Sequence, residues 1–170
     1  MSNFQEFCTK LKAALEVDFA DEQASVNWLK REVKELPAPG ILLDIEQLDI
    51  GEDEGDGRLP LECSFAAFCI LSICTSNYEL AIKGFAAKVI ALLRHNSFGM
   101  ETVSIPVNLF AEGVDFTPGK SGYICWAVTW QQTVYVGEDI WTGDGIIPSE
   151  VKFGYTPDVG ADNEADYEPL

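Results

Sequence analysis

The chain has 170 residues, of which 47% are hydrophobic, and a formal net charge of −17 that comes from 28 acidic and 11 basic side chains. This length fits one domain, and the hydrophobic content supplies a core, which excludes an intrinsically disordered chain in spite of the charge. The sign of the charge opposes direct binding to nucleic acid or to an anionic membrane, and no apolar run reaches the ~18 residues that a spanning helix needs.

The first third of the sequence predicts two helices. The first begins after Ser2 or Asn3, because apolar residues recur there every three or four positions, at Phe4, Phe7, Cys8, Leu11 and Leu15. The second is predicted over about 22–35, with an apolar stripe of Val26, Leu29, Val33 and Leu36. The run Pro37-Ala38-Pro39-Gly40 ends it.

A β-hairpin with an acidic tip follows. Residues 41–50 form one predicted strand, GEDEGDGR (51–58) a turn-rich loop, and residues 59–75 a second strand. In that second strand the odd positions from Cys63 to Ile73 are all apolar, whereas Glu62, Ser64 and Ser72 fall on the other face. Two-residue alternation of this kind is typical of a strand with one buried face.

The next elements are a long helix and two strands. Apolar residues at helical spacing predict a helix from about Asn77 to Arg94, ended by Asn96 or Gly99. Residues 103–110 form a strand interrupted by Pro106, and residues 123–136 form a strand whose even positions are mostly apolar. We therefore expect an α/β (α+β) fold with a mixed, mostly antiparallel sheet, a long hairpin and two or three flanking helices.

The last 33 residues have no sustained period. We expect one α/β domain over 1–137 and an extended acidic C-terminal arm over 138–170. The arm keeps aromatic residues that a plain linker would not retain, and these are candidate interface residues: Trp141, Phe153, Tyr155 and Tyr167. The arm docks either on a neighbouring molecule or on its own domain.

No motif for catalysis, cofactor binding or metal binding is found. The single histidine, His95, lies at a helix end without a nucleophile motif, which favours a capping role. The five cysteines contain no CxxC pair and fall mainly within apolar patterns, which favours buried thiols in a reducing compartment such as a cytoplasm. We expect no catalytic centre, no cofactor and no metal.

The hairpin loop carries the candidate functional acids Glu52, Asp53, Glu54 and Asp56. Neither register of the EF-hand template fits it, and its acids would repel a phosphate. Since only Arg58 lies nearby, we expect these four side chains to repel one another and to be well solvated. A solvated surface without a function, a channel lining and a protein interface all remain open.

The order of elements resembles the tail terminator (tail completion) proteins of Mu-like long-tailed bacteriophages. The resemblance covers most of the chain, and it is clearest from Ala38-Pro39-Gly40 through the hairpin and from Trp130 to Tyr167, where the strand TWQQTVYVGEDIW leads into the arm VKFGYTPDVGADNEADYEPL. It is a resemblance of pattern, since no single motif is diagnostic.

The resemblance implies an α/β plate that closes into a homohexameric ring in the tail-neck region of a virion, assembled in the host bacterial cytoplasm. The ring would cap the tail tube protein, stop tube polymerisation and join the head-completion (neck) protein, with DNA passing through the lumen without specific binding. Glu52, Asp53, Glu54 and Asp56 would then line the lumen or meet basic residues of the tube or neck. No membrane is involved.

Two other classes of function remain. An acidic decoy that mimics DNA and inhibits a nucleic-acid-binding enzyme suits the charge, although such mimics spread carboxylates along helices or strands. A small hydrolase would need a site that the sequence does not present.

Overall fold

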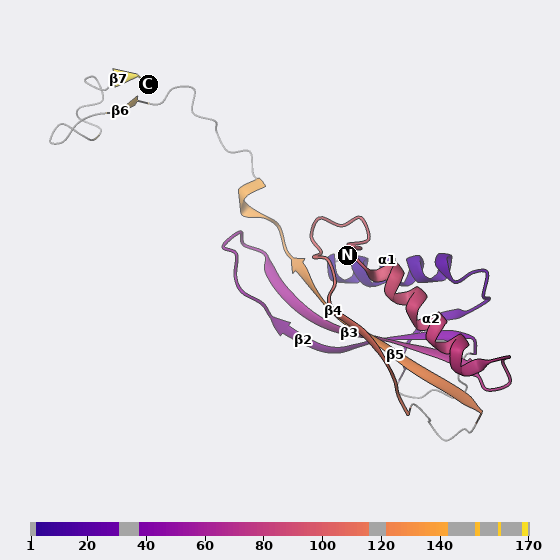
Figure 1. Cartoon of the computed structure of the whole chain (residues 1–170). Helices are drawn as coiled ribbons and strands as arrows, with labels where there is room; N and C mark the ends of the chain where they lie inside the picture. The colour runs from indigo at the N-terminus through magenta and orange to yellow at the C-terminus, as the bar shows by residue number, and fades with distance from the viewer. Residues whose placement is uncertain are drawn as a thin grey trace. The chain divides into compact units, whose positions relative to one another are not determined.

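The structure is a computed structural model that describes residues 3–30, 38–115, 122–142, 152–153, 160 and 168–169. The chain divides into two compact units, Met1–Glu138 and Asp139–Leu170. The first unit contains a five-stranded mixed sheet and two helices, which confirms the predicted α/β class (Figure 1). In the part of the chain that the structure describes, neither helix has the length and apolar character required to cross a membrane.

The strand order in the sheet is β1-β2-β3-β5-β4, so that β3 is central. The strands are β1 (Ser25–Trp28), β2 (Gly40–Ile50), β3 (Leu59–Ser72), β4 (Val107–Gly113) and β5 (Tyr123–Val136). Only the β1–β2 pair is parallel, whereas β2–β3, β3–β5 and β4–β5 are antiparallel. The predicted hairpin of β2 and β3 is confirmed, with a β-bulge between Ile45 and Gln47.

Both helices pack on one face of the sheet, and the core lies between them and the strands (Figure 1). Helix α1 (Asn3–Asp18) buries Phe7, Leu11 and Leu15, which are spaced four residues apart, and α2 (Tyr78–Leu93) buries a similar stripe. A row of aromatic rings joins helix to sheet: Phe7 meets Phe65 edge-on at 5.5 Å, and Phe65 stacks on Trp130 at 5.3 Å. Burying each such side chain contributes about 1.5–3 kcal/mol.

One polar side chain lies inside this core. Gln132 is 2% exposed and occupies a helix-facing position of β5. Its Nε2 donates to the carbonyl oxygens of Asn96 (3.1 Å) and Ser104 (2.7 Å), and its Oε1 accepts from Trp130 Nε1 (3.2 Å). The two bonds to Asn96 and Ser104 link β5 to the connection that follows α2. The bond with Trp130 gives the buried indole N–H an acceptor.

The helix predicted over 22–35 was wrong. Residues 25–28 form strand β1, whose Val26 is buried opposite Ile41 of β2. The backbone N–H of Leu29 donates to Leu43 O at 2.7 Å, so the segment bonds to the sheet and not along a helix. Residues 31–37 lie outside the described part of the chain. Val26 is β-branched, which favours a strand, and pairing with the edge of β2 stabilises the extended backbone more than a short apolar stripe stabilises a helix.

The strand predicted over 103–110 is displaced toward the C-terminus. Val103 forms only an isolated bridge with Val134, and β4 begins after Pro106 and continues to Gly113. Pro106 lacks the backbone N–H that a continuous ladder would need. The other predicted elements, α1, β3, α2 and β5, are confirmed to within a few residues at their ends.

The second unit, Asp139–Leu170, is described in part. A short 3₁₀ helix spans Ile140–Thr142, and strand β6 (Lys152–Phe153) pairs antiparallel with β7 (Glu168–Pro169).

Candidate functional site

The acidic loop forms the tip of the β2–β3 hairpin, which extends beyond the two helices (Figure 1). From Glu46 to Ile50 every residue of β2 is exposed, in contrast to the buried run from Gly40 to Leu43. The hairpin thus has an inner half that belongs to the core and an outer half that projects into solvent.

Asp56 is the buried, hydrogen-bonded acid of this tip. It is only 8% exposed, and its carboxylate accepts hydrogen bonds from Arg58 N (2.9 Å) and Arg58 Nε (2.8 Å). The Arg58 side-chain hydrogen bonds are the main cause that holds the pKa of Asp56 below its usual range. The expectation that all four loop acids are solvated was therefore wrong for Asp56.

Tyr135 of β5 supports the loop from the neighbouring strand. Its hydroxyl donates to Glu54 Oε1 at 2.6 Å, and its ring lies 4.9 Å from Arg58 Cζ in a cation–π contact. The hydrogen bond to Glu54 is the first cause that raises the pKa of Tyr135, and partial burial is the second. Arg58 and Tyr135 together restrain the tip through their contacts with Asp56 and Glu54.

The remaining acids of the loop face solvent. Glu52, Asp53 and Glu54 are exposed, and Asp53 Oδ1 accepts from Gly55 N at 2.8 Å in a tight turn. Gly55 has a φ of 74°, which glycine adopts without strain. The tip consequently presents three carboxylates on an ordered loop, a surface that repels anions and attracts basic groups.

Groups suited to metal binding are not gathered in the described residues, and the buried thiols are not activated. No cluster there of three or more His, Cys, Asp or Glu side chains could hold a metal ion. Burial raises the pKa of Cys8 to about 11 and that of Cys63 and Cys125 to about 12, and it raises the pKa of Cys69 still further. These thiols stay protonated and weakly nucleophilic at neutral pH.

The predicted arm residues are only partly described. Trp141 is 76% exposed, and its backbone N–H donates to Asp139 Oδ1 at 2.8 Å. Phe153 lies in β6, but its side chain is outside the described part, as are Tyr155 and Tyr167. Their role in an interface stays a prediction.

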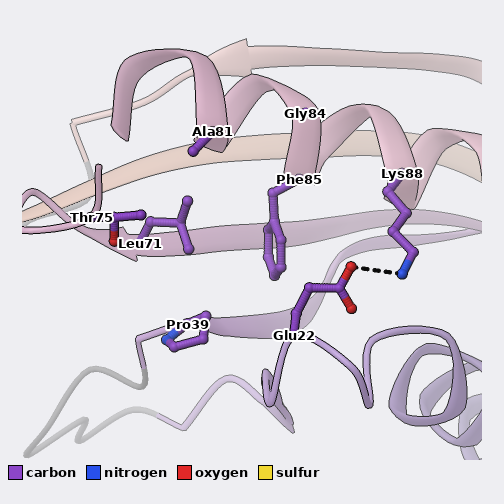
Figure 2. A pocket seen from close by; sticks show the side chains of 8 residues that line it. All are labelled: Glu22, Pro39, Leu71, Thr75, Ala81, Gly84, Phe85 and Lys88. Atoms are coloured by element: carbon purple, nitrogen blue, oxygen red, sulfur yellow. Dashed lines mark hydrogen bonds and ion pairs between the residues drawn. The ribbon is translucent and has the colours of Figure 1, made fainter. Parts of the chain in front are cut away.

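A cleft of about 490 Å³ lies beside α2 (Figure 2). Apolar side chains line most of it, and Phe85 projects into it from α2. At one end Lys88 Nζ donates to Glu22 Oε1 at 2.9 Å and lies 4.6 Å from the centre of the Phe19 ring. The cleft can accept an apolar side chain beside a salt bridge.

The ion pair does not suit this cleft to proton transfer. The hydrogen bond from Lys88 lowers the pKa of Glu22, and the same bond raises the pKa of Lys88. Both groups are therefore held in their charged forms near neutral pH, whereas a general acid or base works best with a pKa near the operating pH.

Sequence reasoning identified the acids of the tip but missed the groups that order it. Arg58 stood out as the sole base near the loop, yet its bidentate contact with Asp56 is a matter of conformation. Tyr135 is distant in sequence, and it reaches the tip because the β3–β5 register sets it opposite Pro60. A correct prediction of the β3–β5 register would have placed Tyr135 beside the loop.

No family model and no curated protein matches this chain. One solved structure aligns with 74% of the chain and 94% of its own length, at 18% identity and a TM-score of 0.45. A likeness of this size carries no argument about function.

Proposed function

We propose that this protein is a structural assembly subunit without a catalytic centre, and that it acts as a phage tail terminator. In this proposal a homohexameric ring caps the tail tube, stops tube polymerisation and joins the tail to the head-completion proteins of the neck. The observation that carries it is the presence of exposed apolar side chains on both edges of the sheet.

The first edge is the outer half of β2. Strand β1 pairs only with Gly40 to Leu43, so the outer half of β2 has no described strand on that side. Leu48 is 50% exposed and Ile50 is 76% exposed, and both lie on the helix-side face of the hairpin. A monomer gains little from apolar groups placed there.

The second edge is β4 and the residues that lead into it. Ile105 is 50% exposed and Val107 is 51% exposed. Because the two edges present different residues, a contact that joins them is heterologous, and repetition of such a contact closes a ring when the rotation per subunit permits. The six-fold number comes from the resemblance to tail terminators.

The acidic tip gives the ring a charged surface. If the tip faces the lumen, its carboxylates repel the DNA phosphates over about 8–10 Å and keep the genome from adhering to the wall. If the tip faces the tube or the neck, its carboxylates pair with basic residues of those proteins. The stiffness given by Arg58 and Tyr135 suits either arrangement, since a fixed loop loses less conformational freedom on assembly.

The test uses assembly as its readout. The protein is examined by light scattering and negative-stain microscopy, alone over a range of concentrations and with tail tubes of the phage that encodes it. Ile50→Asp should abolish ring formation and capping, because it places a charge in the apolar contact. Val17→Asp is the matched control, since Val17 is 78% exposed but lies on α1. A strictly monomeric wild-type protein that leaves tube ends free would refute the proposal.

A DNA-mimic decoy is the second candidate, favoured by one observation. All five acidic residues of the five main strands lie on a single face of the sheet, the face away from the helices: Asp44, Glu46, Asp49, Glu62 and Glu112. A decoy would be a monomer or dimer that inhibits a basic enzyme, and it would ignore tail tubes. The same scattering measurement therefore separates the two candidates.

A further inference from the structure

The outer face of the sheet, meaning the face opposite the two helices, has an unusual charge pattern. It carries the five acidic residues named above, and the five main strands contain no Lys, Arg or His. At one end the outer face is covered by a small apolar cluster of Leu42, Ile70 and Cys125, against which Leu29 packs. The acidic residues occupy the other part, from Asp44 toward the hairpin tip and across to β4.

This acidic part is hollowed into a trough. A concavity of about 390 Å³ is bordered by Glu46 on one side and Glu112 on the other, with Phe68, Phe110 and Thr129 among the residues between them. A second hollow of about 210 Å³ continues from it, shares Ser64 and Gln131, and is bordered by Asp49 and Glu62. The trough thus has acidic rims; its first hollow has a partly apolar floor in which Phe110 is 51% exposed, and mainly polar side chains line its second hollow.

The trough contains an arrangement that costs stability. Asp49 and Glu62 are directly opposite each other on β2 and β3, and like charges at such positions repel. Gln47 Nε2 donates to Asp49 at 2.6 Å, which relieves Asp49 only in part. On the floor, the buried Thr129 Oγ1 has no hydrogen-bond partner among the described residues. A basic group bound between Asp49 and Glu62 would turn the repulsion into attraction.

The chemistry of the trough selects its occupant. Nucleic acid is excluded by charge, and a second copy of a chain with a net charge of −17 is a poor partner for an acidic surface. The trough extends along β5 from Thr133, opposite Glu62, to Ala127, opposite Glu112. The six steps between those seven residues correspond to about 20 Å of strand, the length of a short extended segment.

We propose that this trough binds a basic segment of a partner protein, with its Lys or Arg side chains at the acidic rims and an apolar side chain on Phe110. The trough is bordered by Val107 and Phe110 of the β4 edge, so it overlaps a surface proposed for ring contacts. Binding of a free peptide does not depend on ring formation, and its failure is therefore distinguishable from failure of the proposed function. The specificity comes from the combination of the exposed Phe110 ring with carboxylates on both sides, because charge alone would attract any cation.

The test uses the full chain and a fluorescent peptide of about nine residues with alternating Lys and Leu. Fluorescence anisotropy gives the affinity, and amide chemical shifts of the labelled protein give the location. We expect shifts in β2, β3, β4 and β5 around the trough. Asp49→Asn with Glu62→Gln should weaken binding roughly five- to tenfold, as expected for the loss of two charge contacts. Loss of the repulsion keeps this variant folded, with a melting temperature equal to or above that of the wild type.

Glu79→Gln with Glu101→Gln is the matched control, because both side chains are exposed and neither is on the outer face. It removes the same charge and should change the affinity less than about twofold. Phe110→Ser should lower the affinity for the Lys-Leu peptide and leave the affinity for a Lys-Ser peptide unchanged. Equal losses in the two charge variants would overturn the proposal. Chemical shifts located on another surface would overturn it as well, and so would a change in self-association in place of peptide binding.

Discussion

Replacing Gln132 tests the polar core contact that holds β5 in place. Gln132→Met keeps the length and approximate volume of the side chain but removes its amide. Trp130 Nε1 then loses its acceptor, and the carbonyl oxygens of Asn96 and Ser104 lose a donor. Gln132 is 2% exposed, so water cannot replace those partners without rearrangement.

The expected loss follows from these contacts. Leaving a buried polar group unsatisfied costs about 1–3 kcal/mol, and three groups lose a partner here. The added apolar contact of methionine offsets part of that total cost. We expect a decrease in the free energy of unfolding of about 2–4 kcal/mol. For a unit of this size that corresponds to a fall in melting temperature of roughly 10 °C.

Urea unfolding followed by circular dichroism measures the change, and the slope of the transition shows whether unfolding remains two-state. Gln131→Met is the matched control: Gln131 is the exposed neighbour and accepts a single hydrogen bond from Asn108 Nδ2 at 2.6 Å. It should cost less than about 1 kcal/mol. If Gln132→Met unfolds within about 0.5 kcal/mol of the wild type, the buried amide contributes nothing net and the reasoning is refuted.

Three further predictions concern the tip, the thiols and the second unit. Because Arg58 lowers the pKa of Asp56, the stabilisation is present above the ordinary carboxyl pKa near 4 and is lost as the pH falls through the lower folded value. Asp56→Asn should therefore be less stable than the wild type at pH 7, and its deficit in urea midpoint should shrink toward pH 2; a constant deficit would contradict the assigned cause. In the native protein a thiol reagent should modify the exposed Cys74 quickly and the buried Cys63, Cys69 and Cys125 only after denaturation, as mass spectrometry of the labelled peptides would show. A chain that ends at Glu138 should keep its far-UV spectrum and melt within a few degrees of the full chain, since the two units are compact separately; a large fall in melting temperature would show that the second unit supports the first.

The sequence alone predicted the elements whose pattern repeats over many residues. Helix α1 and helix α2 each place apolar residues on one stripe over four turns, and β3 and β5 each keep apolar residues at most alternate positions of one face. Patterns of this length are local properties of the chain, because the period of the side chains follows from the backbone geometry of a single element. The hairpin was also predicted from a local property, because the loop between its two strands is rich in Gly and Asp, which favour turns.

Shorter segments were decided by their tertiary partners. Val26 and Leu29 fit a helical stripe as well as they fit a strand, and the edge of β2 determined that Val26 lies in β1 and that the Leu29 N–H bonds to Leu43 just after it. Gln132 broke the apolar alternation of β5, and its burial follows only from the carbonyl groups of Asn96 and Ser104, which the fold brings to it. Local propensity cannot decide such cases, because the deciding hydrogen bonds join residues that are distant in sequence.

The candidate sites divide in the same way. The sequence located the acidic tip, because Glu52, Asp53, Glu54 and Asp56 are consecutive or nearly so. The pairing of Asp56 with Arg58, the contact of Glu54 with Tyr135 and the gathering of Glu46, Glu62 and Glu112 around one trough required the sheet. Strand register assigns each side chain to a face and a neighbour, and a shift of one residue would have moved these carboxylates to the opposite face. Composition determined how much charge the protein carries, and the register of the sheet decided where that charge is concentrated.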